Sequence, residues 1–382
     1  MKLATRLLHA GRDRDPYTGA SSVPIYQCST FAQKDPEQRQ AYDYSRSDNP
    51  TREALELAIA DLEGGAVGLA FASGMAATST VLLLFKPGDH LIAGEDIYGG
   101  TYRVLTTVFK QWQLEVTFVD TTDLAKVRAA IRPATRAIFV ETPSNPLLKI
   151  TDLAAIAQLA HEHQLLAITD NTFMTPVAQR PLELGFDIVV HSATKFISGH
   201  SDVIAGLAIA RDAALGKRLK SLQNNFGAIL GPQDSWLTLR GVKTLGVRFA
   251  AQQQTAERVA RWLQTRAEVK QVFYPALPAH PGREVHLRQA SGGGGAVVSF
   301  ELAGGGPAAK ALLKRVEVML PAVSLGGVES ILSYPPMMSH AAMPAAERHA
   351  RGINDGLLRL SMGLEDFDDL TADLTQALAP AG

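Results

Sequence analysis

Short apolar runs alternate with amphipathic stretches between about residue 49 and residue 244, and this alternation constrains the fold more than any other feature. Seven runs have the length and composition of buried strands: 67–71, 90–93, 116–119, 137–140, 166–169, 188–190 and 204–209. Apolar residues at three- and four-residue spacing predict helices over 53–62 and 153–161, with Asp152 at the N-cap of the second. Strands that alternate with helices predict an α/β fold in which both faces of a mostly parallel sheet are covered.

The two ends of the chain differ from this central part. Residues 1–48 are polar and irregular, and we expect an arm with little core of its own. Beyond about residue 245 the pattern predicts a long helix over 247–266, strands over 296–302 and 358–361, and a last helix over 370–378. The glycine run at 292–295 predicts a flexible turn, because no helix start follows it. A chain of 382 residues can bury two cores. We therefore divide it into an arm (1–48), a large domain (49–244) and a smaller α+β domain (245–382).

Composition and charge exclude several classes of function. The formal net charge is −1, which provides no basic field to hold nucleic acid. No apolar run approaches the ~20 residues needed to span a bilayer, and charge at Lys2 and Arg6 argues against a signal peptide. The single cysteine, Cys28, cannot form an internal disulfide, and we expect it to be packed. We therefore expect a cytoplasmic protein that binds a small molecule, with neither nucleic acid nor membrane as partner.

The residue that points most directly to chemistry is Lys195, which follows the apolar run 186–190. Desolvation at the end of a buried strand lowers the pKa of an amine and favours Schiff-base chemistry. Two hydroxyls, Ser192 and Thr194, precede it and could hold a phosphate. The run suggests covalently held pyridoxal phosphate; the alternative is a lysine that extends from a strand end into water.

Two further motifs supply other contacts that this cofactor needs. Asp170 ends the apolar run 165–169, and a carboxylate there can pair with a protonated ring nitrogen. The alternative is a helix N-cap or a turn residue. The segment 72–77 follows a strand and opens a helix, where Gly74 lets an anion approach free N–H groups. Many helices open with small residues and bind nothing, so this motif is weak by itself.

The ordered set of motifs resembles the trans-sulfuration family of pyridoxal-phosphate enzymes over nearly the whole chain. This family includes cystathionine γ-synthase, cystathionine β- and γ-lyases and methionine γ-lyase. The segments that carry the resemblance are 42–46, 73–75, 98–101, 141–146, 170–172, 192–195, 324–327 and 358–361. The resemblance implies a PLP-dependent, aspartate-aminotransferase-like large domain (fold type I). It also implies pyridoxal 5′-phosphate as cofactor, a sulfur amino acid as substrate, and a homo-oligomer, usually a tetramer.

The resemblance also implies a role for each matching residue. Lys195 is implied to hold the cofactor covalently and to move protons, and Asp170 to keep the ring nitrogen protonated. The other implied contacts are the phosphate (Gly74, Met75, Ser192, Thr194), the ring face (Tyr98), the ring's phenolic oxygen (Asn145), the substrate carboxylate (Arg359, with Ser324 in the same wall) and the neighbouring subunit's phosphate (Tyr44, Arg46).

Several of these residues also have simpler interpretations. Arg359 could lie on the surface of a short strand, although its neighbours Leu358 and Leu360 are apolar and a buried arginine needs partners. Tyr98 could be a turn aromatic, and Arg46 in its polar run could be a solvated charge.

Two positions bear on which reaction of the family to expect. In the cystathionine γ-synthases and γ-lyases a glutamate usually precedes the serine that matches Ser324, and here that residue is Val323. In methionine γ-lyases a cysteine usually lies two residues after the stacking tyrosine, and here that residue is Gly100. The segments 328–335 and 338–344 are most similar to bacterial cystathionine β-lyases.

We therefore expect a carbon–sulfur lyase of the cystathionine β-lyase type, which acts in methionine biosynthesis. The alternatives are a cystathionine γ-lyase or broad C–S lyase, and then a cystathionine γ-synthase. A regulator that binds the cofactor without turnover is disfavoured, because nothing resembles an appended DNA-binding segment and every catalytic position is filled.

Overall fold

The computed structural model describes residues 1–382 except 12–14, 16, 36, 39, 342 and 380–382. Its larger sheet has the strand order β1-β7-β6-β5-β4-β2-β3. The strands are β1 (Val67–Phe71), β2 (His90–Gly94), β3 (Glu115–Val119), β4 (Thr135–Glu141), β5 (Leu166–Asp170), β6 (Ile188–Ser192) and β7 (Gly206–Ala210). All seven predicted runs therefore form strands of one sheet, and the α/β fold is confirmed.

The sheet is mostly parallel, as predicted, and one strand runs against the others. β7 pairs antiparallel with both β6 and β1, whereas β6, β5, β4, β2 and β3 run parallel to one another. The reason lies in the connection from β6 to β7, where residues 193–205 form turns and loops without a crossover helix. Parallel neighbours need a longer crossover, so this short connection reverses the chain.

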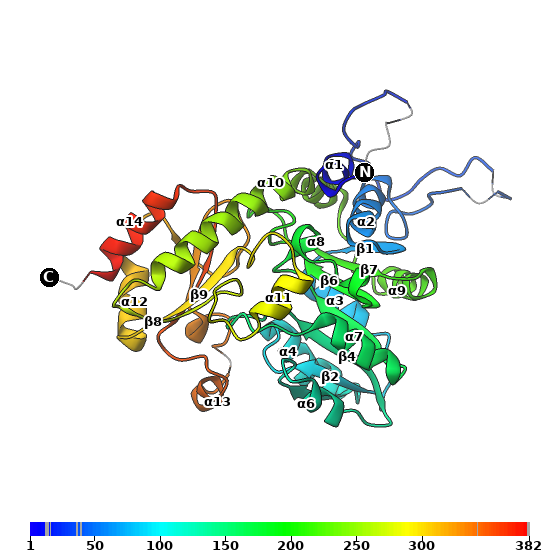
Figure 1. Cartoon of the computed structure of the whole chain (residues 1–382). Helices are drawn as coiled ribbons and strands as arrows, with labels where there is room; N and C mark the ends of the chain where they lie inside the picture. The colour runs from blue at the N-terminus through cyan, green and yellow to red at the C-terminus, as the bar shows by residue number, and fades with distance from the viewer. Residues whose placement is uncertain (12–14, 16, 36, 39, 342, 380–382) are drawn as a thin grey trace.

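Helices cover both faces of the larger sheet (Figure 1). One face packs mainly on α1 (Leu3–His9), α2 (Pro50–Glu63), α7 (Leu153–Glu162), α8 (Thr175–Ala178), the turn η1 (Pro181–Leu184) and α10 (Pro232–Leu263). The other packs mainly on α3 (Gly74–Leu82), α4 (Gly99–Thr106), α5 (Val108–Gln111) and α9 (Ala213–Phe226), and α6 (Leu124–Ala129) lies beside α7. Asp152 caps α7 as predicted, accepting a hydrogen bond from the Ala155 N–H.

A second sheet of order β10-β11-β12-β9-β8 forms the rest of the chain. Its strands are β8 (Val269–Phe273), β9 (Val297–Leu302), β10 (Leu320–Pro321), β11 (Ile331–Ser333) and β12 (Leu357–Ser361). Its helices are α11 (Arg283–Gln289), α12 (Gly305–Arg315), η2 (Pro335–Met337), α13 (Ala345–Ala350) and α14 (Phe367–Leu378). Helices α10, α12 and α14 build its core.

The long helix α10 joins the two sheets (Figure 1). It has 32 residues and begins at Pro232, 15 positions before the predicted start at residue 247. At 1.5 Å per residue it is about 48 Å long, and it contacts α1 and α2 near one end and β8, β9 and α14 near the other. The boundary that we placed after residue 244 thus falls within this helix, and the three-part division of the chain stays a proposal.

Within the described part of the arm, one helix departs from the predicted irregular structure. Residues 3–9 form α1, whose Leu7 side chain is buried, and Thr30 and Tyr44 form an isolated bridge. Cys28 is exposed, so the expectation that it is packed is wrong for the chain by itself.

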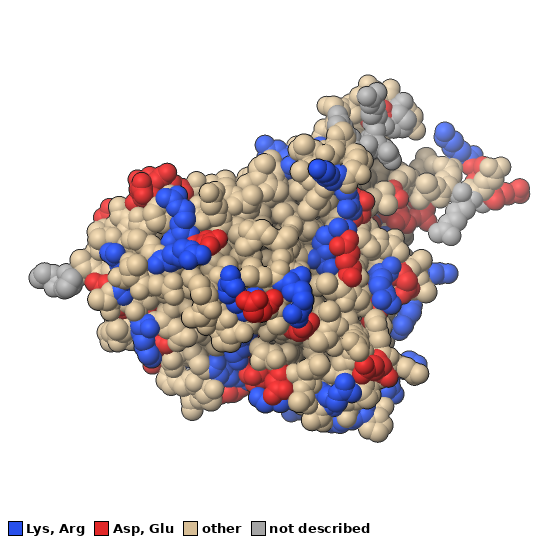
Figure 2. All heavy atoms as spheres, viewed as in Figure 1, with Lys and Arg blue, Asp and Glu red and all other residues tan. Residues whose placement is uncertain are grey.

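The surface agrees with the near-zero net charge. Lysine and arginine side chains lie interspersed with aspartate and glutamate on the face seen in Figure 2, with no field of one sign. Within the described residues, no helix combines the length and the hydropathy that crossing a membrane requires.

Candidate active site

Ten of the twelve predicted site residues line one cavity of about 480 Å³. The cavity lies beyond the carboxyl ends of β4, β5 and β6, where open α/β sheets bind their ligands. The ten are Gly74, Met75, Tyr98, Asn145, Asp170, Ser192, Thr194, Lys195, Ser324 and Arg359. The fold thus brings together side chains that are up to 285 positions apart in the sequence.

Lys195 lies in the turn that follows β6, and its amine points to the second sheet. Its Nζ donates a hydrogen bond to the Ser324 Oγ at 2.5 Å. Burial lowers the pKa of Lys195 to about 8, and the positive charge of Arg359 acts in the same direction. A tenth of such amines are neutral one pH unit below that value, which makes Lys195 a competent nucleophile and proton acceptor near neutral pH.

Asp170 is the last residue of β5 and faces the same cavity. Its Oδ1 accepts a hydrogen bond from the Thr172 N–H at 2.9 Å. Burial raises the pKa of Asp170 above its usual value, against the effect of the Thr172 hydrogen bonds. A cation bound next to this carboxylate would offset the desolvation, and a protonated pyridine nitrogen is such a cation.

The N-terminus of α3 forms the part of the cavity suited to an anion. Ser73 caps this nine-residue helix, and Gly74 opens it. A Cβ at Gly74 would lie 2.9 Å from the Ser192 Cβ and 3.1 Å from its Oγ, so only glycine fits against Ser192 here. Free N–H groups of the helix and the Ser192 hydroxyl therefore converge on one side of the cavity, as phosphate binding requires.

The Thr194 hydroxyl already has partners within the protein. Thr194 lines the cavity, but its hydroxyl bonds the Ala205 backbone, donating to the carbonyl at 3.1 Å and accepting from the N–H at 3.0 Å. Its donation to a phosphate therefore stays a prediction.

Arg359 on β12 is 4% exposed and has polar partners on three sides. Its guanidinium donates to the Asn145 Oδ1 at 2.9 Å and to the Ser324 carbonyl at 2.6 Å, with a longer bond of 3.2 Å to the Ser333 Oγ. Its Nε has no hydrogen-bond partner among the described residues. Burial lowers the pKa of Arg359 to about 10. A substrate carboxylate would supply the acceptor that the Nε lacks and a second negative charge beside the guanidinium.

Asn145 and Tyr98 complete the walls. Because the Asn145 Oδ1 accepts from Arg359, its amide nitrogen remains as a donor toward the cavity. Tyr98 precedes α4 and is 43% exposed. These positions suit a donor to a phenolic oxygen and an aromatic ring that stacks on a planar ligand.

The remaining predicted residues, Tyr44 and Arg46, do not line this cavity. The Arg46 guanidinium donates to the Asn224 carbonyl at 2.7 Å and lies 5.5 Å from the centre of the Tyr44 ring. Both belong to the arm, and their contact with a neighbouring subunit's phosphate stays a prediction.

The cavity also contains residues to which the sequence analysis gave no role. Glu141 ends β4, is 8% exposed, and pairs in register with Asp170. Thr172 holds the Ser192 N–H through its Oγ1 at 2.8 Å, and Ser333 contacts Arg359. The signal for Glu141 was present, because a carboxylate that ends a parallel strand lies beside the end of the next strand.

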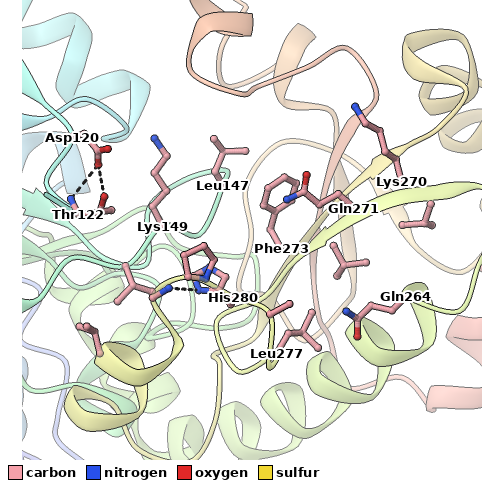
Figure 3. Close-up of a pocket in the computed structure, with 17 residues that line it drawn as sticks. Asp120, Thr122, Leu147, Lys149, Gln264, Lys270, Gln271, Phe273, Leu277 and His280 are labelled. Atoms are coloured by element: carbon pink, nitrogen blue, oxygen red, sulfur yellow. Dashed lines mark hydrogen bonds between the residues drawn. The ribbon is translucent and has the colours of Figure 1, made fainter.

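A larger cavity of about 730 Å³ lies elsewhere, between the loop 147–150 and strand β8 (Figure 3). None of the predicted site residues lines it. Lys149 and Lys270 lie on opposite sides of it, and each ammonium group already has a carboxylate partner, Glu95 at 3.2 Å and Glu301 at 2.8 Å. The residues predicted to bind the cofactor and the substrate thus line the smaller cavity and not this one. No metal-binding cluster of three or more His, Cys, Asp or Glu side chains occurs among the described residues.

Comparison with known proteins agrees with this geometry. A family model described as "Cys/Met metabolism PLP-dependent enzyme" matches residues 4–379. The chain is 57% identical over 376 residues to the cystathionine β-lyase of Bacillus subtilis (strain 168), covering 98% of this chain and 96% of the relative.

Two solved structures superimpose with a TM-score of 0.96, and each alignment covers 99% of this chain and 98% of the other. One is the cystathionine γ-lyase of Lactobacillus plantarum complexed with L-serine, at 49% identity. The other is the cystathionine γ-synthase of Xanthomonas oryzae pv. oryzae in complex with aminoacrylate and cysteine, at 43% identity.

Proposed function

The chain belongs to the PLP-dependent enzymes of Cys/Met metabolism, and from this we propose that it is a cystathionine β-lyase. The reaction converts L-cystathionine and water into L-homocysteine, pyruvate and ammonia, a step of methionine biosynthesis. The residues of the 480 Å³ cavity fit the cofactor, since they offer an anion site at α3, a carboxylate at Asp170 and an amine at Lys195. When bound, PLP supplies an electron-accepting ring that stabilises charge at the substrate's α-carbon.

The observation that carries the choice of β-elimination is the absence of an accessible acid beside Ser324. Val323 lines the cavity and is 66% exposed. Among the described residues that line the cavity, the only carboxyl groups are Glu141 and Asp170, which lie at strand ends beneath it. γ-Chemistry needs a second proton removal, at the β-carbon. With Val323 before Ser324, the cavity lacks the glutamate that the γ-synthases and γ-lyases usually have at this place, which favours the reaction that needs only the first proton removal.

Gly100 supports the same choice within the family. A Cβ at this position would lie 2.4 Å from the Tyr98 Cε1 and 2.8 Å from the Met75 Sδ. A cysteine at this position, as methionine γ-lyases usually have, would therefore displace the Tyr98 ring or the Met75 side chain from the places they occupy here.

Each of the chain's own groups then has one task. Arg359 binds the substrate's α-carboxylate through its unpartnered Nε and an adjacent nitrogen. The amine of Lys195, held by the Ser324 Oγ, takes the α-proton, and its lowered pKa lets it accept and release a proton near neutral pH. The carboxylate of Asp170 keeps a proton on the ring nitrogen.

The proposal extends to assembly and location. We propose a homotetramer built from dimers, in which Tyr44 and Arg46 of the arm complete the phosphate site of a neighbouring subunit. Tyr44 and Arg46 are exposed and do not line the cavity of their own chain, which supports that role. A cytoplasmic location is consistent with one exposed cysteine, which a reducing compartment keeps as a thiol.

Product analysis tests the proposed reaction. We expect purified holoenzyme to form pyruvate and homocysteine from L-cystathionine, and Lys195→Ala, the control for contaminating activity, to form neither. The production of 2-oxobutyrate and cysteine instead would show a γ-lyase and refute the β assignment. Condensation of an acylated homoserine with cysteine would show a γ-synthase.

A further inference from the structure

The mechanism proposed above leaves Glu141 without a task, although its position is costly. It is 8% exposed, ends β4 and faces the same cavity as Asp170 on the next strand. Burial, together with the neighbouring Asp170, raises the pKa of Glu141 well above its usual value. A second carboxyl group beside Asp170 is therefore unfavourable for folding, and a specific contact must explain its presence.

That contact is with the backbone of Tyr98. The Glu141 Oε2 accepts a hydrogen bond from the Tyr98 N–H at 2.7 Å. Tyr98 occupies the N-cap position of α4, and no side chain of its own caps the helix. The contact thus ties the entry of α4 to the end of β4, the strand next to the one that bears Asp170.

The Tyr98 side chain needs such an anchor because its packing is incomplete. Tyr98 is 43% exposed, so the surrounding protein does not enclose the residue. Beneath it lies Gly100, where even a Cβ would come within 2.4 Å of the ring. The absence of a side chain at Gly100 lets the ring approach the floor of the cavity, and the bond at the Tyr98 N–H fixes the backbone from which the ring extends.

We propose that Glu141 is a positioning residue, which holds the Tyr98 ring against the bound cofactor by accepting the Tyr98 backbone N–H. The inference rests on the PLP-dependent family and on the stacking role proposed for Tyr98, and is independent of which lyase reaction the enzyme performs. A carboxylate, a carboxylic acid and an amide all present an acceptor oxygen at this point. The role therefore requires the oxygen and not the charge.

The test compares two variants at position 141 with one control. Glu141→Met removes the acceptor at nearly constant volume, and Glu141→Gln keeps it. Glu301→Met is the control, because Glu301 is also buried (7% exposed) but contacts Lys270 and Asn354, away from the cavity. The Kd for PLP is measured by titrating each apoprotein. The visible circular dichroism of the bound cofactor and the melting temperature of the holoenzyme are measured on the same samples.

We expect Glu141→Met to weaken PLP binding about 10-fold and to reduce the visible circular dichroism, since a buried donor loses its partner. Glu141→Gln should stay within about 2-fold of the wild type. Glu301→Met should lower the melting temperature and leave the Kd for PLP unchanged. Should Glu141→Met fail to fold, Glu141→Ala, which also removes the acceptor of the Tyr98 N–H, should produce the same weaker PLP binding and the same spectral change.

Three outcomes would overturn the inference. Wild-type PLP affinity and a wild-type spectrum in Glu141→Met would show that the contact does not position the Tyr98 ring. A loss in Glu301→Met equal to that in Glu141→Met would show only general destabilisation. A loss in Glu141→Gln equal to that in Glu141→Met would assign the effect to charge. Because no readout involves a substrate, failure of the β-lyase proposal leaves these results interpretable.

Discussion

Replacing Lys195 with methionine should abolish turnover and at the same time stabilise the apoprotein. The amine is surrounded by protein and lies near the positive charge of Arg359, with no carboxylate partner for it among the described ion pairs. A charged amine that is buried and near another positive charge opposes folding. A variant with a neutral side chain of similar length should therefore be more stable. Function and stability are thus expected to conflict at this residue.

The magnitude follows from the pKa of the amine. A decrease from 10.5 in the unfolded chain to about 8 in the folded protein corresponds to about 3 kcal/mol against the charged form. The variant also loses the hydrogen bond to the Ser324 Oγ, worth about 1 kcal/mol. We therefore expect Lys195→Met to raise the free energy of unfolding of the apoprotein by about 2 kcal/mol at pH 7.

The sign of the pH dependence is fixed by the same values. Between pH 8 and pH 10.5 the unfolded chain binds the proton at Lys195 more strongly than the folded protein does, so the wild type gains stability as the pH rises. Urea unfolding of both apoproteins should therefore show a difference in unfolding free energy that is largest below pH 8 and declines toward pH 10.5.

The control is Lys149→Met, at a lysine that is 30% exposed and paired with Glu95 at 3.2 Å. Losing that pair should destabilise the protein by about 0.2–1 kcal/mol, opposite in sign to Lys195→Met. A Lys195→Met apoprotein that is less stable than the wild type, or a difference that stays constant from pH 7 to pH 10, would refute the reasoning.

Three further predictions concern the same cavity. Arg359→Lys keeps the charge but loses the planar pair of donors. Steady-state kinetics should therefore show that kcat/KM for cystathionine falls about 10²-fold, mainly through a higher KM. An unchanged KM would argue against carboxylate binding at Arg359. Asp170→Asn keeps the acceptor for the Thr172 N–H but removes the charge. We expect kcat to fall about 10²–10³-fold while the melting temperature is not lowered. A wild-type kcat would contradict the pairing of Asp170 with the ring nitrogen. The wild-type apoprotein should take up PLP faster as the pH rises through about 8, because only the neutral Lys195 amine attacks the aldehyde. The rate is measured from the absorbance change after mixing. A rate that falls over this pH range would disprove the prediction.

The sequence predicted the large sheet because its strands carry a local signal. Each run is short, apolar and bounded by polar residues, and a strand buried on both faces needs nothing else to be recognised. The direction of β7 carries no such signal, since it depends on how residues 193–205 return the chain. The α/β class could therefore be predicted from the sequence, whereas the antiparallel direction of β7 could not.

The first part of α10 shows why helix boundaries were harder to predict from the sequence. The predicted helix started at residue 247, whereas the segment before it contains Gly241 and Gly246, two residues of low helix propensity. In the fold, a Cβ at Gly241 would lie 2.2 Å from the Ser198 carbonyl oxygen, so the glycine lets the helix pass close to the turn that follows Lys195. A tertiary contact thus selects a residue that local propensity would exclude.

The cavity was predictable where a residue's chemistry is tied to the end of a strand, as for Lys195 and Asp170. The bonds that organise it were not predictable, because they join distant segments. Arg359 and Asn145 are 214 positions apart, and nothing local to either indicates that they share a hydrogen bond. Glu141 lay within a recognised motif, yet its partner, the Tyr98 N–H, is a backbone group that carries no side-chain signature.

Reductive trapping tests the central claim, that Lys195 holds the cofactor, most directly. The holoenzyme is treated with borohydride, digested, and analysed by mass spectrometry for a peptide that carries the reduced pyridoxyl group. The account predicts the modification on Lys195, together with loss of the visible absorbance and of activity. A modification on another lysine, or an unmodified Lys195 peptide from a sample saturated with PLP, would contradict it.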